Sequence, residues 1–62
     1  MTDRELASVT VEANVVEQMS RAHVRMSSDQ DERDAAQAVV RQAVALRRAL
    51  ESWIVKRATR AQ

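Results

Sequence analysis

The sequence predicts an all-α fold, a two-helix antiparallel hairpin that dimerises into a four-helix bundle. Three observations support this prediction: apolar residues recur at helical spacing in both halves of the chain, a polar break separates the halves, and opposite charges gather at their ends. The 62 residues include no glycine and no proline, the residues that favour tight β-turns. We therefore expect one helical domain, residues 1–62.

The first helix is expected over about residues 3–26. Thr2 and Glu5 have the spacing of a capping box, in which two side chains bind free backbone N–H groups at a helix start. The positions that follow on one face recur every three or four residues: Leu6, Val9, Ala13, Val16, Met19, His23 and Met26. A polar turn at about residues 27–29 ends this helix.

The second helix is expected over about residues 29–58, with Ser27 and Gln30, or Ser28 and Asp31, forming a capping box at its start. Acidic residues fill its first turns and basic residues its last, which suits the helix dipole. Its apolar stripe is the clearest pattern in the chain: Ala36, Val39, Ala43, Leu46, Leu50 and Trp53.

Folding the two helices back on each other brings opposite charges together. Acidic Asp3 and Glu5 come beside Arg57 and Arg60, and the basic end of the first helix, with Arg21 and Arg25, comes beside the acidic start of the second. The same fold-back places Ala13 near Ala43, Val16 near Val39, and Leu6 near Leu50. The charge pattern thus favours the antiparallel hairpin.

An alternative is an N-terminal strand followed by two helices. Apolar and polar residues alternate from Ala7 to Val15, and three of the five apolar ones are β-branched valines, a pattern typical of a half-buried strand. This segment resembles that of ribbon–helix–helix repressors and antitoxins. The resemblance implies that Ser8, Thr10 and Glu12 face the DNA major groove.

A second resemblance supports the hairpin. The length, the Thr2 and Glu5 start and the paired heptad stripes resemble the plasmid Rop family. That resemblance implies a helical hairpin that dimerises into a four-helix bundle and binds paired RNA loops. It rests on the architecture of the whole chain and identifies no functional residue.

Size and composition restrict what the chain does. A domain of 62 residues buries only about 60% of its unfolded surface, and without cysteine it has no disulfide or thiolate zinc site to stabilise it. We therefore expect a homo-oligomer or a larger protein partner to supply the missing burial. Met1 leads directly into charged residues, and no uncharged run is long enough to cross a membrane, so we expect a cytoplasmic protein without a membrane partner.

His23, the one histidine, is the obvious candidate for a general base or a metal ligand. Its neighbours on a helix are Met19, Ser20, Met26 and Ser27, which provide neither an orienting carboxylate nor a second ligand. We therefore predict no catalytic residue, and we place His23 at the edge of the helix contact.

An acidic cluster opens the second helix: Asp29, Asp31, Glu32 and Asp34. It resembles the start of a calcium-binding loop, but Asp34 and Val40 occupy the positions that need glycine and glutamate. The cluster is better explained by the helix dipole. We expect no metal site, no cofactor and no enzyme activity.

Two candidate surfaces remain on the second helix. The predicted interface consists of Val39, Leu46, Leu50, Trp53 and Ile54, with Trp53 as a candidate anchor. The predicted nucleic-acid contacts are Arg41, Arg47, Arg48, Lys56 and Arg57. The first surface indicates a small helical interaction or regulatory protein that self-associates or docks on a larger partner. The second indicates the alternative, a dimeric nucleic-acid-binding regulator of plasmid, phage or antitoxin type.

Overall fold

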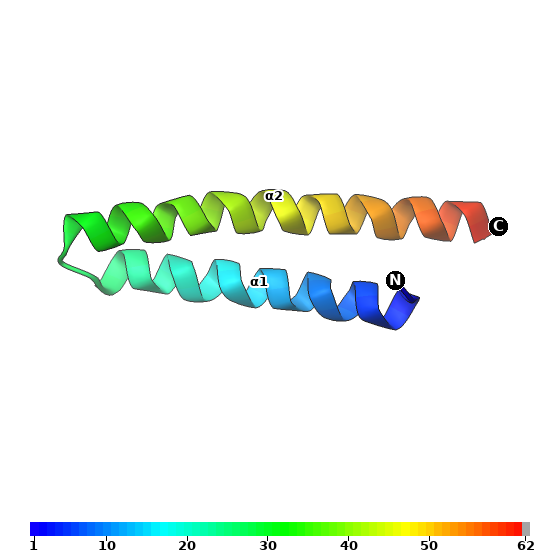
Figure 1. Cartoon of the computed structure of the whole chain (residues 1–62), viewed down its shortest axis with the longest axis horizontal. Coiled ribbons are helices and arrows are strands. Elements are labelled where there is room, and N and C mark those ends of the chain that lie inside the picture. The colour runs from blue at the N-terminus through cyan, green and yellow to red at the C-terminus, as the bar shows by residue number, and fades with distance from the viewer. Residues whose placement is uncertain (62) are drawn as a thin grey trace.

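The computed structural model describes residues 1–61 as two long α-helices that run side by side in opposite directions (Figure 1). Helix α1 spans Asp3–Met26 and helix α2 spans Gln30–Ala61, and a short turn joins them. The molecule is a rod of 50 × 15 × 14 Å. The all-α prediction is confirmed, and the arrangement matches the predicted hairpin. Gln62, the last residue of the predicted domain, lies outside the described residues.

The strand alternative is wrong, because residues 7–13 lie within α1 and residues 1–61 contain no strand. The burial pattern gives the physical reason. Leu6 and Ala13 are buried one heptad apart, whereas Val11 and Val15 of the alternating series are exposed. The helical period therefore fits the partner helix, and the two-residue period has no second surface to pack against.

The start of α1 forms as predicted. The backbone N–H of Glu5 donates to Thr2 Oγ1 at 3.1 Å, and the backbone N–H of Thr2 donates to Glu5 Oε1 at 2.9 Å. This reciprocal pair is the predicted capping box. Hydrogen bonding of the Glu5 carboxylate by the Thr2 backbone N–H, and then by the Thr2 side chain, holds the pKa of Glu5 below its ordinary value of 4.5.

The start of α2 differs from both capping predictions. The cap is Asp29, whose Oδ1 accepts hydrogen bonds from the backbone N–H groups of Asp31 at 2.9 Å and Glu32 at 3.3 Å. Ser27 instead holds the turn, since its Oγ accepts from the backbone N–H of Asp29 at 3.2 Å.

Helix α2 also extends past its predicted end, to Ala61 instead of residue 58. The physical reason is that no glycine or proline follows to end it, and basic Arg60 suits the negative end of the helix dipole. As a result α2 continues beyond the start of α1 (Figure 1).

Small side chains form most of the contact between the helices. The buried hydrophobic residues of the described chain are Leu6, Ala13, Ala36, Ala43 and Leu50. Leu6, Ala13 and Leu50 pack as one cluster with Val9 at its edge, so the predicted meeting of Leu6 and Leu50 is confirmed. Alanines let the helices approach closely but bury little apolar area, and the hairpin alone has a thin core.

Candidate interaction surface

Three of the five large exposed apolar residues of α2 follow a heptad of their own. Val39, Leu46 and Trp53 each lie three residues after a buried residue of the hairpin core, Ala36, Ala43 and Leu50 respectively. Three residues turn an α-helix by about 300°, so this series lies on one flank of the contact. The three side chains are 42%, 51% and 43% exposed. A regular apolar row on α2 is therefore left without a partner.

Helix α1 adds to the same surface. Val9 and Val16 lie three residues after buried Leu6 and Ala13, and Val16 is 46% exposed. In two antiparallel helices the equivalent flanks lie on the same side of the pair. His23 lies one heptad after Val16, and Glu32 lies one heptad before Val39, so each residue continues the row of its helix. The contact between them, 3.6 Å from His23 Nε2 to Glu32 Oε1, therefore joins the two flanks.

Together the two rows make one elongated surface, which we call the apolar face: Val9, Val16, Val39, Leu46 and Trp53. Of the five predicted interface residues, Val39, Leu46 and Trp53 lie on the apolar face, whereas Leu50 and Ile54 lie elsewhere. Leu50 lies inside the hairpin core, and Ile54 lies on the seam between the helices, where it lines a groove of about 280 Å³ with Leu6 and Ala58. Sequence reasoning placed no residue of α1 in the interface, although the heptad spacing of Val9 and Val16 was a usable signal.

A carboxylate lies buried at the centre of the hairpin. Glu17 is 4% exposed, and its two oxygens bind Arg21 Nε at 3.0 Å and Arg47 Nε at 3.1 Å. Arg47 Nη1 also binds Glu51 Oε1 at 2.8 Å. The hydrogen bonds from Arg47 and then Arg21 hold the pKa of Glu17 below 4.5. In this network, Arg47 joins α1 to α2 through a buried carboxylate whose two oxygens are both paired.

The network predicts a loss of stability in acid. Since the folded-state pKa of Glu17 is depressed, its stabilising effect is complete above pH 4.5 and disappears as the pH falls through the lower folded value. We expect the melting temperature, followed by circular dichroism, to fall between pH 6 and pH 3. Glu17→Gln should lower it at pH 6 and make it depend less on pH. An equal pH dependence in both proteins would contradict this role for Glu17.

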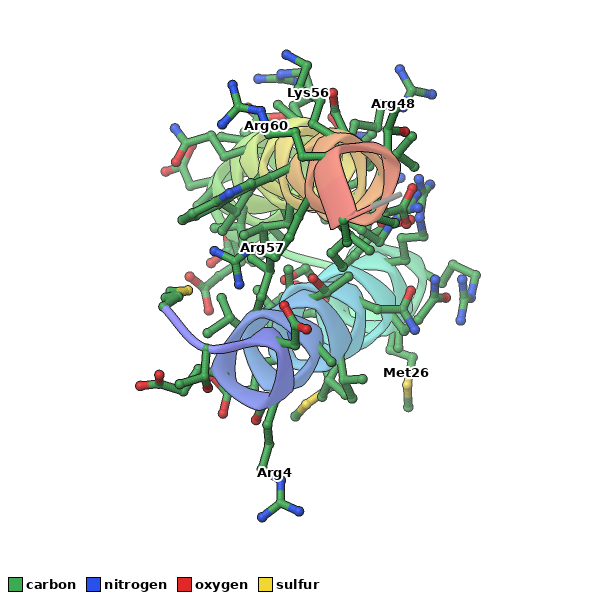
Figure 2. All side chains as sticks on the ribbon, turned by 90° about the vertical axis from the view of Figure 1, so that its right-hand side faces the viewer. Arg4, Met26, Arg48, Lys56, Arg57 and Arg60 are labelled. Carbon is green, nitrogen blue, oxygen red and sulfur yellow. The ribbon has the colours of Figure 1, made fainter. Side chains whose placement is uncertain are left out.

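Two of the five predicted nucleic-acid contacts are used within the hairpin. Arg47 binds the buried Glu17 carboxylate of α1. Arg57 Nη1 binds Asp3 Oδ1 at 3.0 Å, which is the contact that the charge pattern predicted. Arg57 also lies 5.3 Å from the centre of the Trp53 ring, and Figure 2 shows it between the two helices. Both cations therefore have internal roles.

The other three predicted contacts form no ion pair within residues 1–61: Arg41, Arg48 and Lys56. Arg48 and Lys56 project from α2 on the side away from α1 (Figure 2). At the turn, Arg21 binds Glu17 on its own helix instead of the acidic start of α2.

No three His, Cys, Asp or Glu side chains in residues 1–61 lie together as metal ligands. Neither helix combines the length and the apolar character needed to cross a membrane, over the same residues. In comparisons with known proteins, the chain matches no protein-family model, no curated protein and no solved structure.

Proposed function

We propose that this protein is a non-enzymatic interaction and regulatory protein that acts by self-association, with two hairpins pairing through their apolar faces into a four-helix bundle. The observation that carries the proposal is the unpartnered heptad of Val39, Leu46 and Trp53. A row of large apolar side chains at this spacing is typical of helices that pack on other helices.

A second copy suits the size of the surface. The apolar face runs along one side of a rod 50 Å long, so a second rod of the same length can lie against it. The hairpin also needs this burial, because three of its five buried hydrophobic residues are alanines. Pairing of two copies meets both requirements.

The sequence of α2 supports an antiparallel pairing of the copies. Leu46 is the middle residue of its row, with Val39 and Trp53 one heptad away and Glu32 and Arg60 two heptads away. With a two-fold axis at Leu46, this residue faces its own copy, and Trp53 faces Val39 of the other copy. Glu32 then meets Arg60, so opposite charges pair at both ends of the interface.

The mass in solution tests the proposal. Size-exclusion chromatography with light scattering should give about twice the 7.0 kDa of one chain at micromolar concentration. Trp53 is the only tryptophan, so its fluorescence should shift to longer wavelength when dilution separates the copies. A 7.0 kDa species that melts cooperatively would overturn self-association.

A further inference from the structure

The flank opposite the apolar face contains a hollow of about 440 Å³ between the two helices, which is open to solvent and which we call the arginine cavity. Both helices line it near the turn, through Arg21, Val24, Arg25, Gln37, Val40 and Arg41. Gln37 precedes Val39 by two residues, which turns it about 200° around α2, so the cavity and the apolar face point to opposite sides. The cavity therefore stays open when the apolar faces pair.

The cavity lining carries uncompensated positive charge. It includes three arginines and no acidic residue. Arg21 is held by Glu17, whereas Arg25 and Arg41 form no ion pair within residues 1–61. Guanidinium groups from both helices therefore line the same cavity. An anion bound there would form charge-assisted hydrogen bonds with Arg25 and Arg41.

We propose that this cavity binds a compact phosphate-bearing small molecule. Planar guanidinium groups match phosphate oxygens with paired hydrogen bonds, and the Gln37 amide adds a neutral donor. Val24 and Val40 offer an apolar wall for the carbon part of the ligand. The volume lies within the roughly 300–1,000 Å³ of small-molecule sites. The net charge of +1 gives little long-range attraction for a long polyanion, so a small ligand suits the chain better.

Binding is tested on the full-length protein by NMR titration of its backbone amides with pyrophosphate and with ATP. The proposal expects saturable shifts confined to the cavity residues near the turn. It also expects binding to weaken by about tenfold or more in the double variant Arg25→Gln, Arg41→Gln, which removes two charge-assisted contacts. Circular dichroism of the variant shows whether it remains helical.

A matched control is Arg4→Gln with Arg48→Gln, which removes two arginines that project away from the hairpin (Figure 2) and should leave binding unchanged. Equal weakening in the control, or shifts spread over all exposed cations, would overturn the proposal. So would a short DNA or RNA duplex that binds more tightly than either probe, since the site would then be part of a nucleic-acid surface. The mass measurement is independent, so this proposal and self-association fail separately.

Discussion

Replacing Leu46 with glutamate is expected to convert the proposed dimer to a monomer. Leu46 lies at the centre of the apolar face, and the proposed two-fold axis places it opposite its own copy. Leu46→Glu therefore opposes two carboxylates in an apolar contact, and burial of unpaired charge costs several kcal/mol. We expect the dissociation constant to rise by about 100-fold or more. Light scattering and sedimentation at matched concentrations measure this change.

The control for this experiment is Val55→Glu. Val55 is 63% exposed and lies on the same helix, two residues from Trp53 but outside the apolar face. It adds the same charge without entering the proposed contact, so the variant should remain dimeric. Dissociation of both variants to the same extent would indicate a general effect of charge. A dimeric Leu46→Glu protein would show that the copies meet through another surface.

Leu6→Ala is expected to destabilise the fold more than any other alanine substitution. Leu6 is 1% exposed and packs against Ala13 and Leu50 in the main core cluster. Truncating a buried leucine costs about 2–5 kcal/mol, and a domain of 62 residues has a total stability of about 3–9 kcal/mol. Chemical denaturation followed at 222 nm should show a large fall in the unfolding midpoint.

Val11→Ala provides the comparison for the core substitution. Val11 is 61% exposed on the same helix, so its truncation should change the free energy of unfolding by less than about 0.5 kcal/mol. Similar midpoints for the two variants would mean that the Leu6 cluster is not the core of the fold. Both should be measured at one protein concentration, because the proposed association of the copies contributes to stability.

The features that depend on local sequence were predicted best. Both helices and the Thr2–Glu5 cap formed as predicted, because helical spacing and capping are decided within a few residues. The second cap was predicted wrongly. Ser27, Ser28 and Asp29 are all favourable N-cap residues, and the choice between them depends on how the chain reverses direction at the turn.

The candidate surfaces were only partly predictable, because they depend on the register between helices. In the sequence, the stripe from Ala36 to Trp53 is one pattern, whereas the structure divides it into a buried row and an exposed row. The contact of Glu17 with Arg47 joins residues 30 positions apart, so spacing along one helix gives no sign of it. The arginine cavity also combines both helices, whereas the sequence predicted Arg21 and Arg25 only as partners for the acidic start of α2.

The alanine-rich seam also determines how the fold responds to temperature. The heat capacity change of unfolding grows with the apolar surface that becomes exposed, and the isolated hairpin has little to expose. Its stability curve is therefore flatter than that of an ordinary domain, with a broad and shallow thermal transition. The proposed association through the apolar face adds apolar burial and steepens the curve. If the copies pair as proposed, gradual melting becomes a sharp, concentration-dependent transition.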